Sequence, residues 1–534
     1  MSQPGILATL RSGGPFQVPS RAAALFDRLR GHVSLAGLER ERIPVRTPFT
    51  GEVLGSIPAA LECDVEWAIA RARLAQPAWA ALPIRERAKI FLRFHDLLLQ
   101  RQEEALDLIQ LESGKARRHA FEEILDTAGV TRYYALHAAR HLRPRRRKGA
   151  LPGLTKTLEL RSPVGIAGFI VPWNYPLNVA ITDALPALIA GNAAILKPDH
   201  QTSFTALWAV ALLREAGLPE EVLQVLTGEG PRVGPMVAER VDYLMFTGST
   251  RTGRMVGKRA SERLIGCSLE LGGKNPMLVL RDADLTAAVE GAIRGCFAGA
   301  GQVCISIERI YVHEALYHEF ASRFAERSGR LRLGAALDYS VDMGTLTSAR
   351  QLETVEAHVR DALEKGAALL AGGHRRPELG PFFYEPTILE NVREGMRVWD
   401  EETFGPVVSL YSFADEEDVI LRANATNYGL NASVWTRDTA RGVALASRIR
   451  AGSVNVNEAY AAAWGSPDAP VGGMEDSGLG RRHGREGIFK FTESQTVAVQ
   501  RLVPLAPPFG MSPERWARVM TFLLRVVRRT RVLG

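Results

Sequence analysis

The sequence predicts an α/β protein with two parallel sheets, and three observations lead to this fold class. Apolar runs of strand length alternate with helical segments, and this alternation occurs twice along the chain. The predicted strands are apolar throughout, which is typical of strands covered on both faces by helices. The chain also contains 49 glycines, as expected where many strands turn tightly into helices.

The first 145 residues are predicted to be mainly helical. Residues 1–20 hold several Gly, Pro and Ser and are expected to form a loose arm. RAAALFDRLRGHVSL, from residue 21, predicts an amphipathic helix, and VRTPFTGEVLGSIPAA, from residue 45, predicts a hairpin with a Thr-Gly turn. Apolar residues then recur at steps of three and four in three stretches, which predict helices over 65–79, 84–114 and 120–142.

A parallel sheet is predicted between residues 165 and 273. TKTLEL, at 155–160, alternates like a strand and is flanked by Pro and Gly, so a projecting hairpin is expected before the sheet. Five apolar strands follow, with helices between them at 177–191, 202–217, 231–240 and 250–263. Ligands bind such sheets at the carboxyl ends of the strands. The residues at those ends are Pro172, Lys197, Gly228, Thr247 and Glu270.

A second alternation of strands and helices predicts another α/β domain. NPMLVL, RIYVHE, PTILE, VVSLYSF, SVWT and SVNVN are predicted strands, and helices are expected over 316–331 and 351–366. This domain opens near Leu271 and carries Cys304, so a site that uses Glu270 and Cys304 would lie in an interdomain cleft. The predicted division of the chain is 21–145 (helical part of the first domain), 146–165 (hairpin), 166–270 (first sheet), 271–470 (second domain), 471–505 (return segment and strand) and 506–534 (basic helical tail).

Composition excludes several classes of protein. Hydrophobic content of 46% and charged content of 23% are typical of a soluble globular protein. The net charge of +7 comes largely from residues 143–148 and 515–534, and no aromatic-basic module for nucleic acid accompanies it. Cys63, Cys267, Cys296 and Cys304 show no metal-ligand spacing, and so few thiols suit a reducing, cytoplasmic compartment.

Three residues carry the types of side chain that an acyl-transfer site needs. Cys304, in GQVCIS, supplies a thiol after a glycine-rich run, and we expect an exposed, polar neighbourhood that favours its thiolate. Glu270, in LELGGKNP, supplies a carboxylate, and Asn174, in VPWNYPL, an amide donor. Each has another interpretation: a structural cysteine, a solvated glutamate, and an asparagine that caps a helix starting near Pro176.

Seven motifs together give the chain a clear resemblance to a known family. VPWNYPL, GNAAILKPD, FTGSTRTG, LELGGKNP, GQVCIS, EETFGPV and NYGL occur in the order and at the spacing of the aldehyde dehydrogenase superfamily, across residues 30–500. The residues in and around these motifs are most similar to those of the NADP-dependent succinate-semialdehyde dehydrogenase branch. The resemblance implies two Rossmann-like domains and an oligomerisation hairpin. It also implies that Cys304 attacks an aldehyde, that Glu270 activates water on the resulting thioester, and that Asn174 and the Cys304 N–H hold the oxyanion.

The resemblance also implies a dinucleotide site. Its residues would be Val171, Trp173, Lys197, Pro198, Asp199, His200, Gly248, Ser249, Leu271, Glu402 and Phe404. NAD-preferring members carry Glu where this chain has His200, and an imidazole tolerates the 2′-phosphate that a carboxylate would repel. We therefore predict NADP, with NAD as the alternative. His200 pointing to solvent, and Phe404 serving only as core packing, are the interpretations without a cofactor role.

The substrate is less well defined. Members that oxidise succinate semialdehyde hold its carboxylate with arginines, but the corresponding positions near Thr182 and Ala298 are not basic, and Asp183 would repel an anion. Tyr460 and Trp464 are expected at the mouth of the site, where they suit an apolar or aromatic aldehyde. Succinate semialdehyde is the first expectation and an apolar or aromatic aldehyde is the alternative. A cysteine hydrolase and a non-catalytic relic are the rival functions.

The expected partners are a small aldehyde and further copies of the chain. A homodimer or homotetramer would form through the 146–165 hairpin and the 491–503 strand. No nucleic acid or metal is expected. The basic tail is expected to pack on a neighbouring subunit, and contact with a membrane surface is the alternative. In GGMEDSG, Glu475 stands where the family commonly has Lys, and we expect a structural effect on that loop.

Overall fold

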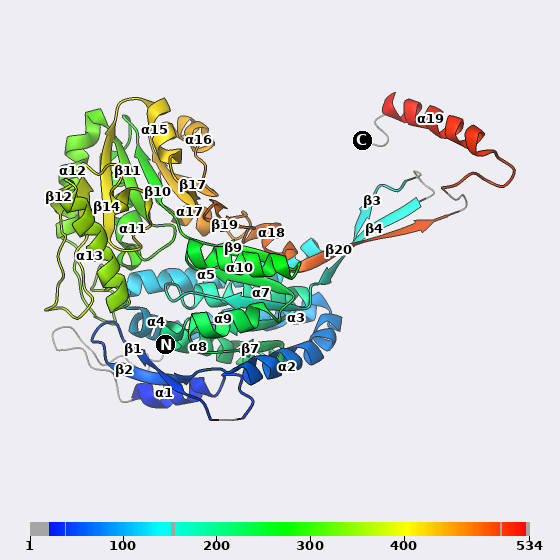
Figure 1. Cartoon of the computed structure of the whole chain (residues 1–534), viewed down its shortest axis with the longest axis horizontal. Coiled ribbons are helices and arrows are strands. Elements are labelled where there is room, and N and C mark those ends of the chain that lie inside the picture. The colour runs from blue at the N-terminus through cyan, green and yellow to red at the C-terminus, as the bar shows by residue number, and fades with distance from the viewer. Residues whose placement is uncertain (1–20, 38, 151–154, 502–504, 530–534) are drawn as a thin grey trace.

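The computed structural model describes residues 21–37, 39–150, 155–501 and 505–529. Two sheets with helices packed on them form the body, and a small third sheet projects from it together with the C-terminal helix (Figure 1). The predicted fold class, two parallel-sheet units and a hairpin, is therefore confirmed.

The first sheet has six strands in the order β19-β9-β8-β5-β6-β7. The five central strands are parallel, mostly buried, and match the five predicted ones. β19 pairs antiparallel with β9 and was not predicted, because two residues give no periodic pattern. The strand order reverses between β5 and β8, which is where such sheets bind ligands. The bounds are β5 (Ile166–Ile170), β6 (Ala193–Lys197), β7 (Leu223–Val225), β8 (Tyr243–Thr247), β9 (Gly266–Glu270) and β19 (Gly478–Leu479).

Helices of the N-terminal half surround this sheet. The predicted hairpin is present as β1 (Arg42–Arg46) and β2 (Val53–Pro58). The predicted helix over 84–114 is wrong in one respect: it breaks at Arg101, whose side chain bonds Glu104 and Glu215 as the chain turns. The helices are α1 (Arg21–Arg30), α2 (Glu62–Ala81), α3 (Ile84–Gln100), α4 (Gln102–Ser113), α5 (Arg117–Leu142), α8 (Ser203–Glu215), α9 (Gly230–Ala238) and α10 (Thr250–Glu262), with 3₁₀ turns η1 (His200–Thr202) and η2 (Glu220–Val222).

The helix predicted over 177–191 is also divided. It forms α6 (Asn178–Ile181) and α7 (Ala184–Ala190), and Asp183 lies between them. The Asp183 carboxylate is buried in ion pairs with Arg482 at 2.6 Å and Lys490 at 3.0 Å. These two cations explain why a polar residue is accommodated at the break.

The second sheet has seven strands in the order β12-β13-β14-β11-β10-β16-β17. All six predicted strands are present and parallel, and the antiparallel edge strand β12 was not predicted. The strands are β10 (Asn275–Val279), β11 (Ile307–His313), β12 (Ala368–Ala371), β13 (Thr387–Glu390), β14 (Val407–Phe413), β16 (Asn431–Trp435) and β17 (Ser453–Val456). The helices are α11 (Leu285–Phe297), η3 (Ala298–Gly301), α12 (Glu314–Gly329), α13 (Ala349–Glu364), α14 (Arg397–Asp400), α15 (Glu416–Asn424), α16 (Thr439–Ala446), α17 (Ala461–Trp464) and α18 (Gly484–Phe489).

The projecting sheet, which we call the arm, has the order β20-β4-β3. Its strands are β3 (Arg145–Arg147), β4 (Thr155–Pro163) and β20 (Thr492–Gln500), and the predicted loose arm over 1–20 lies outside the described residues. Helix α19 (Pro513–Arg529) follows β20 and lies beyond the arm, away from both large sheets (Figure 1). No helix among the described residues is long and apolar enough to cross a membrane.

The loop with Glu475 is a two-stranded ribbon of β15 (Tyr428–Gly429) and β18 (Met474–Glu475). Glu475 has a positive φ of 52° and its carboxylate accepts a hydrogen bond from Arg450 at 2.5 Å. The departure from the common Lys is thus accompanied by a local ion pair on an exposed loop.

Candidate active site

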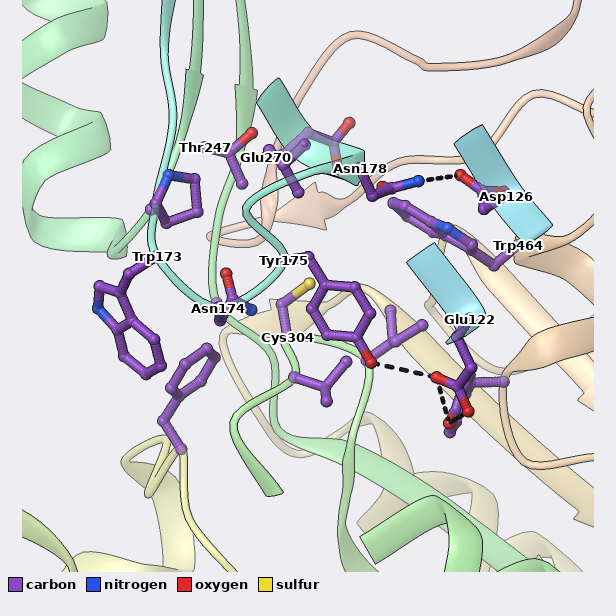
Figure 2. Close-up of a pocket in the computed structure, with 18 of the residues that line it drawn as sticks. Glu122, Asp126, Trp173, Asn174, Tyr175, Asn178, Thr247, Glu270, Cys304 and Trp464 are labelled. Atoms are coloured by element: carbon purple, nitrogen blue, oxygen red, sulfur yellow. Dashed lines mark hydrogen bonds between the residues drawn. The ribbon is translucent and has the colours of Figure 1, made fainter. Parts of the chain in front are cut away.

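A cavity of about 860 Å³ lies between the two large sheets. Residues at the carboxyl ends of β5 and β8 line one wall, and the loops that carry Cys304 and Glu402 line the other. This volume suits a small molecule with a cofactor. Figure 2 shows Cys304 between Asn174 and Tyr175, with Trp173 and Glu122 on opposite sides of it. The cavity therefore has a reaction centre at Cys304 and two ends. We call the end at Trp173 the cofactor side and the end at Glu122 the tail side.

Cys304 follows η3 in a loop whose backbone is closely packed. Gly301 has a φ of 71°, and a Cβ there would lie 2.0 Å from the carbonyl oxygen of Gly405, so only glycine fits. Burial raises the pKa of the Cys304 thiol to about 12, and the negative charges of Glu402 and Glu270 add to this shift. The thiol is half-buried where it lines the cavity, so the expectation of an exposed thiol is wrong. The resting residue is a thiol, and its deprotonation needs a base.

Glu270 ends β9 and is 4% exposed. Burial raises the pKa of its carboxyl to about 7, although the charges of Arg482 and Lys490 oppose the shift. Its Oε1 atom has no hydrogen-bond partner among the described residues. A carboxylate with a pKa near neutrality and an unused oxygen is suited to take a proton from a thiol or a water.

Asn174 is buried, and its amide Nδ2 donates to the carbonyl oxygen of Gln302 at 3.0 Å, beside the cysteine loop. The interpretation of Asn174 as a helix cap is wrong, because α6 begins only at Asn178 and no cap bond comes from Asn174. The amide keeps a second N–H, which can donate to an oxygen on a carbon bonded to Cys304.

A buried ion pair holds the Asn174 loop, and sequence reasoning did not find it. Lys115 Nζ donates to the Asn174 carbonyl at 2.6 Å and to Glu123 at 2.7 Å. Glu123 in turn accepts from the backbone N–H groups of Leu177 and Asn178. Nothing in the sequence distinguishes these two residues from other charged residues near a helix start.

The two glycines after Glu270 allow the two sheets to meet. A Cβ at Gly272 would lie 2.4 Å from a Glu402 carboxylate oxygen, and a Cβ at Gly273 would lie 2.5 Å from the carbonyl oxygen of Cys304. At Gly273 the backbone leaves no room for a side chain, whereas at Gly272 a side chain would displace the Glu402 carboxylate. The base and the nucleophile are thus brought together by direct contact between backbones.

The cofactor side contains six of the residues predicted to bind a dinucleotide. Trp173 and Phe404 meet edge to face with ring centres 5.6 Å apart. Glu402 accepts a hydrogen bond from the Gly273 N–H at 2.9 Å, and burial raises the pKa of its carboxyl to about 8. The six residues that line this side are Trp173, Gly248, Ser249, Leu271, Glu402 and Phe404.

These residues fit a dinucleotide. Ser249 caps α10 and its hydroxyl accepts from the Thr252 N–H, so the helix N-terminus faces the cavity edge and suits a pyrophosphate. The buried Thr247 hydroxyl has no partner among the described residues and is available to a ligand. A Cβ at Gly248 would lie 2.6 Å from the Phe246 ring, which explains the glycine there.

The other five predicted cofactor residues do not line the cavity. Val171, Lys197, Pro198, Asp199 and His200 lie at and after the carboxyl ends of β5 and β6. Lys197 is buried, and burial lowers the pKa of its ammonium group. His200 opens η1 with its side chain 40% exposed and its Nδ1 3.4 Å from an Asp199 oxygen.

The tail side contains two carboxylates that the sequence analysis missed. Glu122 and Asp126 are one helical turn apart on α5 and both line the cavity. Glu122 accepts hydrogen bonds from the hydroxyls of Tyr175 at 3.2 Å and Tyr460 at 3.1 Å, and Asp126 accepts one from Asn178 (Figure 2). Burial raises the pKa of both carboxyls, that of Asp126 to about 6. The spacing of four residues in AFEEILDTAG is the only sequence signal for this pair.

Both predicted substrate residues lie on the tail side. Tyr460 and Trp464 line the cavity, Tyr460 just before α17 and Trp464 at its end. The ring of Trp464 lies 5.1 Å from the Arg482 guanidinium, and Tyr460 is tied to Glu122. They supply an aromatic surface opposite the carboxylates of α5.

Each arginine that lines the tail side is already paired with a carboxylate. Arg118 bonds Asp342 at 2.8 Å, Arg482 bonds Asp183 at 2.6 Å, and Arg294 bonds Glu458. The expected repulsion of an anion by Asp183 is wrong, because its charge is neutralised by Arg482 and Lys490 and it does not line the cavity. Arg482 itself was missed. It comes from GRRHGREG, far along the chain, where nothing predicts burial.

A thiol and a carboxyl of raised pKa that line one cavity, next to a face that fits a dinucleotide, define the class of NAD(P)-linked dehydrogenases that work through a covalent cysteine adduct. Comparison with known proteins agrees with this class. The chain belongs to the aldehyde dehydrogenase family, since the family model with the description "Aldehyde dehydrogenase family" matches residues 36–497.

Similar proteins cover nearly the whole chain. A Mycolicibacterium smegmatis protein with the provisional name succinate-semialdehyde dehydrogenase [NADP(+)] is 49% identical over 96% of this chain and 99% of its own length. A solved Escherichia coli structure described as an NADP dependent enzyme is 37% identical, with a TM-score of 0.83 over 86% of this chain and 95% of its own. The NAD+ complex of a Bacillus cereus aldehyde dehydrogenase is 33% identical, with a TM-score of 0.82 over 86% and 93%.

Proposed function

We propose that this protein oxidises an aldehyde to a carboxylic acid with NADP, using Cys304, Glu270 and Asn174. The observation that carries the proposal is the single cavity in which a thiol, a base with a raised pKa and an amide donor lie next to a face that fits a dinucleotide. Family membership supports the same reaction.

In the proposed reaction the Cys304 sulfur gives up its proton and bonds to the aldehyde carbon. Glu270 is the group placed to take that proton. The carbonyl oxygen gains negative charge, and the Asn174 amide and the Cys304 N–H donate hydrogen bonds to it. The bound cofactor supplies the acceptor for the hydride that leaves the carbon. A thioester remains on Cys304. Glu270 releases the first proton to solvent and then deprotonates the water that attacks the thioester. The carbon–sulfur bond breaks, the acid leaves and the thiol is restored.

An aldehyde-oxidation assay tests this proposal directly. NADPH absorbance should rise with aldehyde and wild-type enzyme, and the Cys304→Ala variant should abolish the rise. Ester cleavage without cofactor, and without any aldehyde oxidation, would instead support a cysteine hydrolase. Absence of both activities in a folded protein would support a non-catalytic relic.

We propose NADP rather than NAD as the main cofactor. His200 places no negative charge beside the ribose position, and the names of the mycobacterial relatives and the E. coli neighbour specify NADP. The ratio of kcat/KM for NADP to that for NAD should exceed one in the wild type. It should fall in a His200→Glu variant, while a His200→Gln variant should keep it. A wild-type preference for NAD would contradict the proposal.

Succinate semialdehyde is the first candidate substrate, because it appears in the names of relatives that match most of the chain. An apolar or aromatic aldehyde is the second candidate, and a specific observation favours it: every arginine lining the tail side is already paired, whereas Glu122 and Asp126 have no ion-pair partner among the described residues. Comparing kcat/KM for succinate semialdehyde, butanal and benzaldehyde separates the two candidates.

We further propose a homodimer or homotetramer in a cytoplasmic compartment. The arm presents the exposed edge strand β20, which can pair with another subunit. Four free cysteines suit a reducing compartment. The domain divisions at 145/146, 165/166, 270/271, 470/471 and 505/506 belong to the same proposal. Light scattering of the full chain checks the assembly, and cell fractionation checks the compartment.

A further inference from the structure

Helix α19 concentrates exposed apolar side chains more densely than any other described element. Five large ones fall within eight residues, namely Val519, Phe522, Leu523, Leu524 and Val526. On the body, such side chains occur singly, as with Leu74 on α2 or Leu264 after α10. Scattered apolar side chains need no explanation, but a contiguous exposed group marks a surface that binds something.

The helix also separates its apolar and charged residues. Trp516, Val519, Met520 and Leu523 recur at steps of three and four and form one stripe, which we call the apolar stripe. Arg518 and Arg525 lie on the opposite face by the same periodicity, and both are exposed. Glu514 is the one acidic residue of the helix. An arginine-rich polar face opposite a stripe with Trp and Leu is typical of a helix that lies in a membrane interface.

The arm next to α19 is also positively charged. The described residues 143–150, 155–163, 492–501 and 505–529 together contain 13 Lys or Arg and three Asp or Glu, against 66 and 59 in the whole chain, so the rest of the chain carries a net negative charge. Arg146 is exposed on β3. The positive charge of the protein is therefore gathered on the part that projects from the body (Figure 1).

We propose that α19 lies in the surface of an anionic phospholipid membrane, with its apolar stripe among the acyl chains and its arginines and the basic arm facing the lipid phosphates. A dense anionic surface complements both features of the projection at once. Docking of α19 on the same helix of a second copy would bring two arginine-rich faces together, which would oppose that contact. The helix binds at the interface and does not span the bilayer, in keeping with its length and charge.

Sedimentation of the full chain with phospholipid vesicles tests this proposal. Vesicles of phosphatidylcholine with phosphatidylglycerol should bind the wild type at least tenfold better than vesicles of phosphatidylcholine alone. Moderate salt should weaken the binding. A Leu523→Glu variant, which places a charge in the apolar stripe, should lose at least tenfold. An Arg525→Ala variant should lose about fivefold, as expected for one cationic side chain at an anionic surface.

Leu264→Glu is the matched control, because Leu264 is 93% exposed on the body and belongs neither to the arm nor to α19. This variant should bind vesicles like the wild type, and all variants should keep aldehyde oxidation, which reports folding. The proposal is overturned if anionic and neutral vesicles bind the wild type equally, or if Leu523→Glu and Leu264→Glu behave alike. It is also overturned if Leu523→Glu lowers the oligomer mass while the wild type binds no vesicles, since α19 would then dock on a second copy.

Discussion

The reaction centre and the tail side belong to one cavity but are built in different ways. Around Cys304, positions are set by backbone: Gly273 touches the Cys304 carbonyl, and Gly301 touches Gly405. On the tail side, positions are set by side chains of α5 and α17, such as Glu122 and Trp464. A change at the centre should therefore alter the rate for every aldehyde, whereas a change on the tail side should alter the choice among aldehydes.

Removing the thiol should have the largest effect. Cys304→Ala eliminates the atom that bonds to substrate, so kcat for aldehyde oxidation should fall about 10⁴-fold or more with every aldehyde. NADPH absorbance measures this. Cys296→Ala is the control, because Cys296 is buried on α11 and does not line the cavity. A comparable loss from Cys296→Ala would mean that packing, and not chemistry, explains the result.

Removing the base should rank next. Glu270→Gln should lower kcat by about 10²–10⁴, because neither the Cys304 thiol nor the attacking water is then deprotonated. NADPH absorbance measures this loss. In the wild type, kcat should fall as pH drops through about 7, because Glu270 then becomes protonated. A flat pH profile between 6 and 8 would remove Glu270 from the role of base.

Glu270→Gln should lower the rate but raise the free energy of unfolding. A carboxyl whose pKa is raised from 4.5 to about 7 by folding destabilises the fold increasingly between those values and fully above pH 7. At 1.4 kcal/mol per pKa unit, the cost is about 3 kcal/mol. Glu270→Gln should thus unfold at higher denaturant concentration than the wild type at pH 8, and the gain should shrink toward pH 5.

Removing the oxyanion donor should have a smaller effect on rate. Asn174→Ala should lower kcat by about 10²–10³, with similar factors for succinate semialdehyde and butanal. It also removes the bond to Gln302, so about 1 kcal/mol of stability should be lost. Parallel rate and unfolding measurements separate the two. A loss restricted to one aldehyde would assign Asn174 to the tail side instead.

Changes on the tail side should have the smallest effect on chemistry. Glu122→Gln with Asp126→Asn removes two negative charges near the substrate tail. The ratio of kcat/KM for succinate semialdehyde to that for butanal should therefore rise about tenfold, while kcat for butanal stays within about twofold. Asp96→Asn, on the far exposed face of α3, is the control. An equal change in kcat for both aldehydes would erase the distinction between the two ends of the cavity.

This contrast explains what the sequence could predict. Cys304, Glu270 and Asn174 stand in short motifs at strand ends, and the parallel sheets bring those ends together. All eleven strands predicted for the two large sheets are present, while the strands of these sheets that were missed, β12 and β19, pair antiparallel at an edge. Breaks at Arg101 and Asp183 were missed because distant ion partners, not local propensity, decide them.

The environment of each site residue was harder to predict than its identity. The thiol was expected to be exposed, but it is half-buried in the cavity, and its desolvation raises its pKa to about 12. Glu122, Asp126, Lys115 and Arg482 were missed because helix periodicity marks them as ordinary charged residues. Only the tertiary fold turns them toward the cavity or the Asn174 loop.

The close packing at Gly272 and Gly273 limits which substitutions evolution can accept at these positions. Because carbonyl and carboxylate oxygens occupy the space where a Cβ would stand, mutation has no small steps available at these positions. At Glu122 and Asp126 on α5, by contrast, the contacts are between side chains, so one side chain can be exchanged for another there. Related proteins with this arrangement can therefore evolve a different range of aldehyde substrates while the reaction at the cysteine stays the same.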